Sequence, residues 1–328
     1  MTLSIAIAQV NPTVGAVAKN LDLVRRARER GREAGADLVV FPELVLVGYP
    51  PEDLVLRPAL TEAAAAALEA LRTESAAGGP ALIVTLPVRH DGRLYNAAAL
   101  VDNGRVDLRF KCDLPNYGVF DEKRVFAAGT APEPVTFRGV RIGLPICEDI
   151  WHHGITTELA RRGAELLLVP NGSPFEVDKF DVRVQLAATR VAECGVPLAY
   201  VNQVGGQDEL VFDGGSFIVN GDRTVVARAP FWEESLFLTR WTRRENGFAC
   251  EPGAHAPLPG REESIYAAMV LGLRDYVRKN GFPGVVLGLS GGIDSALTAA
   301  VAVDAIGADR VRGRSEEHTS ELQSRETI

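Results

Sequence analysis

Apolar and polar residues alternate in blocks along the first 230 residues of the chain. Short apolar runs of strand length occupy residues 4–10, 37–41, 81–88, 166–169 and 197–202. Between them, apolar residues recur at helical spacing over 21–34, 59–75, 155–162 and 179–194. Paired segments at 95–101 and 106–111, 134–137 and 141–147, and 216–220 and 224–229 have the pattern of hairpins. Helices that alternate with buried strands predict an α/β layered domain, and the hairpins predict a mixed sheet.

The pattern changes after residue 243. Residues 244–263 are rich in glycine, proline and charge, which predicts a linker. A helix over 265–278, a strand over 284–289, a glycine turn and a helix over 294–306 then predict the start of a second α/β domain. With one strand and no sheet to join it, this fragment (264–313) should leave the apolar faces of its helices without partners.

Residues 314–328 are almost wholly polar and have no periodicity. The string RSEEHTSELQS at 314–324 resembles the translation of a sequencing-library adapter. We therefore expect a non-native tail over 314–328 and a natural chain that continues past Gly313, with a natural disordered tail as the alternative.

Composition and charge exclude several classes of protein. With 46% hydrophobic residues and a net charge of −8, the chain has no global attraction for nucleic acid or anionic lipid. Neither a signal peptide nor an apolar run long enough to span a bilayer is present, so no membrane association is expected. The four cysteines are widely spaced without a C-x-x-C motif, which indicates reduced thiols and a cytoplasmic protein.

Three polar residues follow apolar strands, where α/β sheets usually place their sites. Glu43 could be a general base, and Lys111 could neutralise a thiolate or an oxyanion. Cys147 ends a strand close to a helix start, which predicts a lowered pKa and a reactive thiolate. Taken singly, each has an ordinary alternative: a cap, a solvated charge or an inert buried thiol, the last of which suits Cys194 and Cys250 better.

Together the three residues resemble the Glu-Lys-Cys triad of the nitrilase superfamily of carbon–nitrogen hydrolases. The strings that carry the resemblance are FPEL, KCDLPNYGVFDE and PICEDIW, within about residues 1–240. The resemblance implies a nitrilase-type α-β-β-α sandwich over residues 1–243, with the site between the sheet ends.

The strings LPNYGVFDEKRVF and NGSPF resemble more narrowly the glutaminase domain of glutamine-dependent NAD synthetases. This likeness implies that Glu43 is the general base, Lys111 stabilises the oxyanion and Cys147 forms a glutamyl thioester. Glu122 matches an additional glutamate that would orient the lysine. The residues expected to hold the glutamine are Tyr117, Glu148, Ser173 and Lys179.

The segment VVLGLSGGIDS at 285–295 lacks the lysine of a Walker A loop. It resembles instead the SGGxDS pyrophosphate loop of N-type ATP pyrophosphatases. The expected ATP-binding residues are Ser290, Gly291, Gly292, Asp294 and Ser295. A glycine turn at a helix start directs backbone N–H groups at phosphate oxygens, and the serines add donors. The likeness implies an incomplete Rossmann-like synthetase domain that uses ATP and Mg²⁺. We expect no metal site in the protein itself, and a helix start is the simpler account of His152 and His153.

Together these resemblances imply a glutamine-hydrolysing ligase. Ammonia from glutamine would amidate nicotinic acid adenine dinucleotide to NAD at the expense of ATP, within a homo-oligomer. Two alternatives stay open: a stand-alone nitrilase-type amidase, or a non-enzymatic oligomerisation module. The SGGIDS segment disfavours the first, and the retained triad disfavours the second.

Overall fold

The computed structural model describes residues 1–130, 132–245 and 247–315, which form two compact units. The first unit contains residues 1–205 and 212–258. The second contains residues 206–211 and those from Pro259 onward. Of the expected tail, only Arg314 and Ser315 are described, at the end of the last strand, and residues 316–328 lie outside the described part.

The first unit contains a mixed sheet of seven strands in the order β15-β14-β1-β2-β3-β4-β5. Its parallel centre is formed by β1 (Thr2–Gln9), β2 (Leu38–Val40) and β3 (Ala81–His90). Antiparallel strands flank it: β4 (Arg93–Asp102) and β5 (Arg105–Phe110) on one side, β14 (Ser235–Arg244) and β15 (Gly247–Cys250) on the other.

A second sheet of six strands has the order β13-β12-β9-β8-β7-β6. In chain order its strands are β6 (Val135–Phe137), β7 (Val140–Gly143), β8 (Leu166–Asn171), β9 (Leu198–Asn202), β12 (Phe217–Val219) and β13 (Val225–Arg228). A separate hairpin is formed by β10 (Val204–Gln207) and β11 (Leu210–Asp213).

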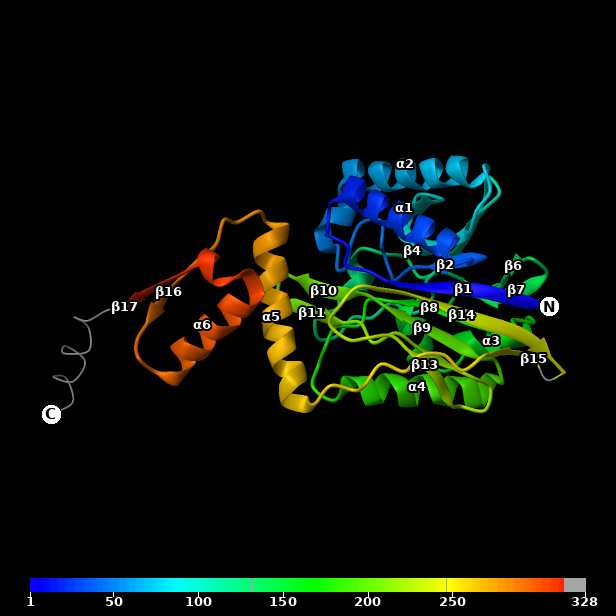
Figure 1. Ribbon diagram of the computed structural model, residues 1–328. Coiled ribbons are helices and arrows are strands. Elements are labelled where there is room, and N and C mark those ends of the chain that lie inside the picture. Colours follow the sequence, from blue (N-terminus) through cyan, green and yellow to red (C-terminus); the bar gives the residue numbers. More distant parts are fainter. Residues whose placement is uncertain (131, 246, 316–328) are drawn as a thin grey trace. The chain divides into compact units, whose positions relative to one another are not determined.

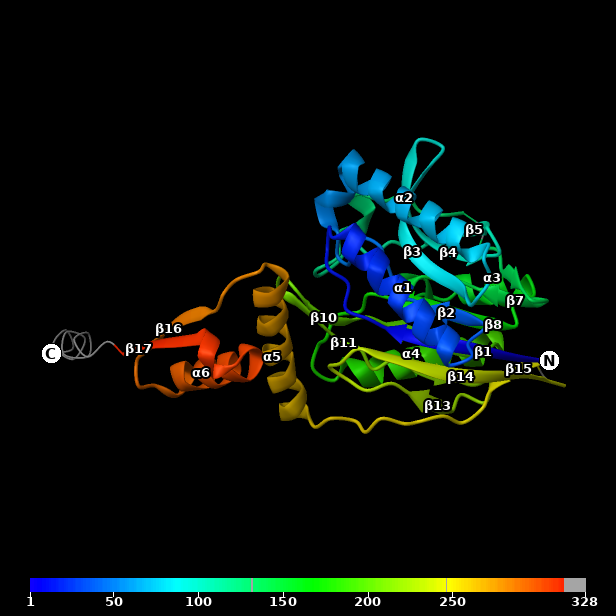
Figure 2. The same ribbon diagram turned by 45° about the horizontal axis from the view of Figure 1, so that its top comes forward.

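Side-chain alternation along the strands explains the four layers. On β8, Leu166 and Leu168 enter the core between the two sheets, while Leu167 and Val169 pack toward the helices α3 (Ile155–Arg161) and α4 (Lys179–Cys194). The helices α1 (Val17–Glu33) and α2 (Pro58–Ser75) cover the other sheet (Figures 1 and 2). The expected α-β-β-α sandwich is confirmed.

The end of the first unit differs from the expectation of a linker over residues 244–263. Gly247–Cys250 forms β15, which pairs with β14 and buries Phe248 and Cys250 in the core between the sheets. A four-residue strand with one glycine gives little periodic signal, so glycine, proline and charge dominate the local pattern. The helix after it also begins earlier than expected, at Arg261.

The second unit contains α5 (Arg261–Lys279), β16 (Val285–Leu289), α6 (Ile293–Ile306) and β17 (Val311–Ser315). The expectation of one strand without a partner was wrong, because β17 pairs with β16 in parallel. The apolar helix faces are covered only in part: Val277 of α5 packs with Ala305 and Ile306 of α6, whereas Met269, Ile293 and Leu297 are exposed. The strand β17 was not predicted because its sequence, VRGRS, is mostly polar and contains a glycine, so it has no apolar strand pattern. None of the described helices combines the length and apolar character that a membrane span requires.

Candidate active site

Four strand ends of the first unit converge on one region. Glu43 follows β2, Lys111 follows β5, Cys147 follows β7 after three residues, and Gly172 follows β8. A backbone bond from Glu43 N to Asn171 O (3.4 Å) connects the first of these segments with the last. The fold therefore brings the expected triad residues together, at the ends of strands from both sheets.

Lys111 lies between two carboxylates in the protein interior. Its Nζ is 2.7 Å from Glu43 Oε1 and 2.9 Å from Glu122 Oε1, and the side chains of Lys111 and Glu43 are fully buried. Burial alone would lower the pKa of the Lys111 ammonium, but the charges of Glu122 and Glu43 raise it well above its usual value. The lysine is consequently a fixed cation at neutral pH.

Two residues that sequence reasoning missed hold Glu43 in place. Asn96 Nδ2 donates to Glu43 Oε1 (2.7 Å), and the backbone N–H of Gly172 donates to Oε2 (3.0 Å). Oε1 thus accepts from both Asn96 and Lys111, whereas Oε2 accepts one hydrogen bond. Because a carboxylate oxygen can accept two, Oε2 keeps a free position for a proton.

Tyr49 is a further missed residue beside the lysine. Its hydroxyl donates to Glu122 Oε1 (3.0 Å), and its ring packs so tightly against Gly172 that an added Cβ would lie 2.7 Å from Cδ1. A side chain at position 172 would displace this ring or the backbone N–H that binds Glu43. Gly172 is therefore required by close packing rather than by its backbone dihedrals.

Cys147 opens a 3-10 turn (Cys147–Ile150) with a φ of 43°, an uncommon and strained conformation for a residue with a side chain. It is 4% exposed. Burial and the charge of Glu43 raise the pKa of the thiol well above its ordinary value, although Lys111 and the Gly172 N–H act in the other direction. The expectation of a lowered pKa was wrong, because it neglected burial and the neighbouring carboxylate. Burial therefore favours the neutral form of the Cys147 thiol, which lies close to the Glu43 carboxylate.

A cavity of about 500 Å³ opens onto Cys147. All four residues expected to bind glutamine line it: Tyr117, Glu148, Ser173 and Lys179. Its walls are otherwise formed by Gly118, Phe120, Trp151, Glu176, Val177, Asp178 and Val182. The cavity therefore offers carboxylates, one ammonium, hydroxyls and aromatic surface beside the thiol.

The polar groups of this cavity are oriented by neighbours. Tyr117 donates to Glu148 Oε2 (2.9 Å), and burial raises the pKa of Glu148. Lys179 is paired with Glu176 in the same turn. His152 lies 3.4 Å from Glu148 Oε1, which accounts for this histidine without a metal.

Ser173 is held from behind by a buried arginine. Arg183 Nε donates to Ser173 Oγ (3.0 Å), and Arg183 forms a buried ion pair with Asp213 (2.7 Å). Because the serine oxygen accepts from Arg183, the hydroxyl proton points elsewhere, and Ser173 also forms a side-chain hydrogen bond with the neighbouring Tyr200.

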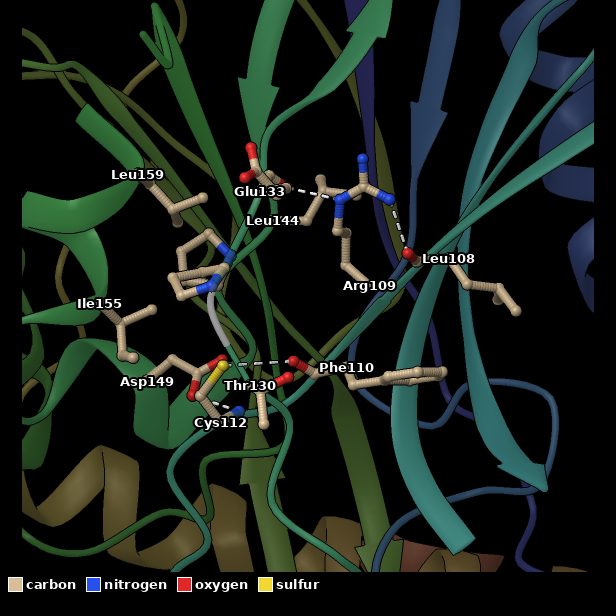
Figure 3. A pocket seen from close by; sticks show the side chains of 12 residues that line it. Leu108, Arg109, Phe110, Cys112, Thr130, Glu133, Leu144, Asp149, Ile155 and Leu159 are labelled. Atoms are coloured by element: carbon tan, nitrogen blue, oxygen red, sulfur yellow. Dashed lines mark hydrogen bonds between the residues drawn. The ribbon is translucent and has the colours of Figure 1, made fainter. Parts of the chain in front are cut away.

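A second cavity, of about 290 Å³, shares no lining residue with the first (Figure 3). Several of its polar groups are bonded within the protein: Arg109 donates to the carbonyls of Leu108 and Glu133, and the Cys112 thiol contacts Phe110 O (3.5 Å). We take the cavity at Cys147 as the candidate substrate site, because it opens onto the thiol and is lined by all four residues expected to bind glutamine.

The expected ATP loop lies in the second unit, between β16 and the start of α6. Gly291 has a φ of 81°, which favours glycine, and Ser295 Oγ donates to Gly292 O (2.9 Å) while accepting from Ser290 (3.3 Å). The loop is solvent-exposed. In the described part of the chain, no group of three or more His, Cys, Asp or Glu side chains could hold a metal ion.

Replacing Lys111 by methionine is expected to destabilise the protein. Two buried carboxylates would then face each other without a cation, and breaking a buried ion pair in this way costs about 3–5 kcal/mol. Thermal unfolding should show a clearly lower Tm, part of which an added Glu122→Gln change should restore. An unchanged Tm in Lys111→Met would mean that the ion pairs contribute little to folding.

Two family models match the chain. A model described as carbon–nitrogen hydrolase matches residues 4–243, and one described as NAD synthase matches residues 265–324. The second match thus extends beyond Gly313 into the stretch expected to be non-native.

Curated relatives and solved structures agree with the two family matches. A glutamine-dependent NAD(+) synthetase from Rhodobacter capsulatus is 47% identical over 308 residues, 94% of this chain and 56% of the relative. The structure of an NAD+ synthetase from Acinetobacter baumannii in complex with ADP has a TM-score of 0.91 at 37% identity, covering 99% of this chain and 62% of that one. An amidase from Nesterenkonia has a TM-score of 0.65 at 31% identity, covering 72% of this chain and 89% of that one. The chain spans little more than half the length of the curated relatives it matches.

Proposed function

The chain belongs to the carbon–nitrogen hydrolase family, and on this premise we propose that its first unit hydrolyses the side-chain amide of glutamine through a thioester on Cys147. The observation that carries the proposal is the buried Glu43–Lys111 pair beside a thiol that opens onto a cavity with both acidic and basic groups. A zwitterionic substrate needs such a mixed lining.

The first half of the reaction forms the thioester. As Cys147 Sγ attacks the amide carbon, Glu43 Oε2 takes the thiol proton, and the Lys111 ammonium stabilises the negative charge that develops on the carbonyl oxygen. Collapse of the tetrahedral intermediate breaks the carbon–nitrogen bond, and Glu43 returns the proton to the departing nitrogen. Ammonia leaves, and the glutamyl group stays on sulfur.

The second half releases glutamate. Water loses a proton to Glu43 and attacks the thioester carbon, so that the carbon–sulfur bond breaks and the thiol regains its proton. Glu122 and Tyr49 take no part in bond changes in this scheme. They hold the Lys111 ammonium, which stays charged throughout because its pKa is raised.

Recognition of glutamine follows from the charges of the cavity. Glu148, supported by Tyr117, would bind the α-ammonium group, and Lys179 would bind the α-carboxylate. Ser173 would donate its hydroxyl proton to the substrate, in place of its hydrogen bond with Tyr200. To bind the α-carboxylate, Lys179 must break its ion pair with Glu176.

For the complete enzyme we propose a glutamine-hydrolysing NAD synthase, a ligase. Ammonia from the first unit would amidate nicotinic acid adenine dinucleotide in a domain that begins with α5. The loop of Ser290, Gly291, Gly292, Asp294 and Ser295 would bind the pyrophosphate of ATP, and Mg²⁺ would be held by the phosphates. Support comes from the NAD synthase match and from the relatives' names. Self-association and a cytoplasmic location, where thiols are kept reduced, are part of this proposal.

A stand-alone amidase is the second candidate, favoured by the likeness to the Nesterenkonia amidase over 89% of that chain. Substrate preference separates the two. We expect kcat/KM for glutamine to exceed that for propionamide by about 10²-fold or more, because a simple amide has no charged groups that could bind Glu148 and Lys179. Glu148→Gln should raise KM for glutamine and leave propionamide hydrolysis unchanged. Equal rates with both amides would favour the general amidase.

A further inference from the structure

Asp149 is a buried carboxylate to which the mechanism above gives no role. It is 1% exposed and accepts three backbone N–H bonds. Oδ2 accepts from Ile146 (2.8 Å), and Oδ1 accepts from Cys112 (2.9 Å) and Asp113 (2.7 Å). Figure 3 shows Asp149 and Cys112 side by side, and both line the second cavity.

The positions of these N–H groups are informative. Ile146 directly precedes Cys147, and Cys112 directly follows Lys111. Lys111 comes from β5 at the edge of one sheet, while Cys147 follows β7 of the other sheet. One carboxylate thus joins the two sheets at the backbone positions next to the nucleophile and the lysine.

The backbone–backbone hydrogen bonds of Lys111 and of the Cys147 turn do not fix the separation between these two segments. Lys111 N donates to Asn96 O (2.8 Å) and Lys111 O accepts from Gly129 (2.7 Å), both of which fix the lysine within its own half of the site. The turn that carries Cys147 is closed by Asp149 N and Ile146 O (3.0 Å), again a local contact. The Asp149 carboxylate joins the backbones of the two segments directly, whereas the Tyr117–Glu148 hydrogen bond joins them through side chains.

We propose that Asp149 is a positioning residue that sets the separation between the Lys111 ammonium and the Cys147 thiol. The inference rests on the proposed roles of these two residues. A carboxylate is the one side chain of this size that presents only acceptors, so it can receive N–H groups at both ends. Asparagine has the same shape, but its NH₂ group would face an N–H donor at one end.

The cost of burial supports a geometric role. Burial raises the pKa of Asp149 to about 7, against the N–H bonds from Ile146, Asp113 and Cys112 and the charge of Lys111, which lower it. If the side chain only filled space, an apolar residue would avoid this cost.

The test compares Asp149→Asn with Asp222→Asn in the full chain. Asp222 is a matched control, because it also accepts a backbone N–H (Thr224, 3.0 Å) but lies in an exposed turn away from the site. We expect kcat for glutamine to fall by about 10²-fold in Asp149→Asn, the effect of a displacement of roughly 1 Å, with KM unchanged. Asp222→Asn should match wild type.

A second readout does not depend on turnover. The pH midpoint of iodoacetamide alkylation at Cys147 should rise in Asp149→Asn, because a displaced Lys111 no longer lowers the pKa of the thiol. Simple loss of the aspartate charge would move the midpoint down instead, and that result would overturn the proposal. So would a wild-type kcat. If Asp149→Asn fails to fold, Asp149→Glu is the second variant, because it keeps the carboxylate and adds one methylene. It should fold and show both the lower kcat and the higher alkylation midpoint. If it shows neither change, the proposal is rejected. A wild-type protein that does not hydrolyse glutamine would reject the proposed function, while the alkylation midpoint would still test Asp149.

Discussion

Cys147→Ala should reduce glutamine hydrolysis to background, a loss on the order of 10⁶-fold in kcat by analogy with other covalent catalysts that lose their nucleophile. The methyl side chain cannot form the thioester, and no other thiol reaches the cavity at this point. Release of ammonia from glutamine, followed in a coupled assay, measures the effect. Because Cys147 is buried and alanine is smaller, the fold should survive, which circular dichroism can verify.

Two other cysteines provide controls. Cys194 is half-buried at the end of α4, and Cys250 is buried on β15 in the core between the sheets. Cys194→Ala and Cys250→Ala should keep nearly full turnover, although the second should lose some stability. Cys147→Ser is more stringent, because a hydroxyl is a poorer nucleophile that the site cannot ionise at neutral pH. Near-wild-type hydrolysis by Cys147→Ala would show that the nucleophile lies elsewhere.

The sequence was informative where local pattern determines structure. The α/β layers follow from apolar runs of strand length separated by amphipathic ranges, and α4 has the bounds expected from its spacing. The sites of Glu43, Lys111 and Cys147 at strand ends could be inferred for the same reason. What these residues do there remains a prediction.

Features that depend on contacts between distant segments could not be inferred. Asn96 lies in the middle of β4, and nothing in the string YNAAAL indicates that its amide reaches Glu43. The role of Gly172 depends on the ring of Tyr49, which is 123 positions earlier in the chain. The sign of the Cys147 pKa shift likewise depends on burial and on Glu43, neither of which is visible near position 147.

Glu43→Gln should separate the reactivity of the thiol from catalysis. Turnover should fall by about 10²–10⁴-fold, the usual contribution of a general base, because the amide can neither take the thiol proton nor return it to ammonia. KM for glutamine should change little, since Glu43 does not line the substrate cavity. The new NH₂ group would also face the donors Lys111, Asn96 or Gly172, so a moderate loss of Tm is expected.

Thiol alkylation in the same variant should change in the opposite direction. The charge of Glu43 raises the pKa of Cys147, so its removal should lower that pKa and increase the thiolate fraction at any pH below the wild-type midpoint. Iodoacetamide should therefore modify Cys147 faster in Glu43→Gln than in wild type at pH 7, while hydrolysis is lost. The double variant Cys147→Ala/Glu43→Gln controls for labelling of other thiols. If alkylation slows together with turnover, the glutamate acts on the thiol by taking its proton in both reactions, and its electrostatic effect on the thiol is the smaller one.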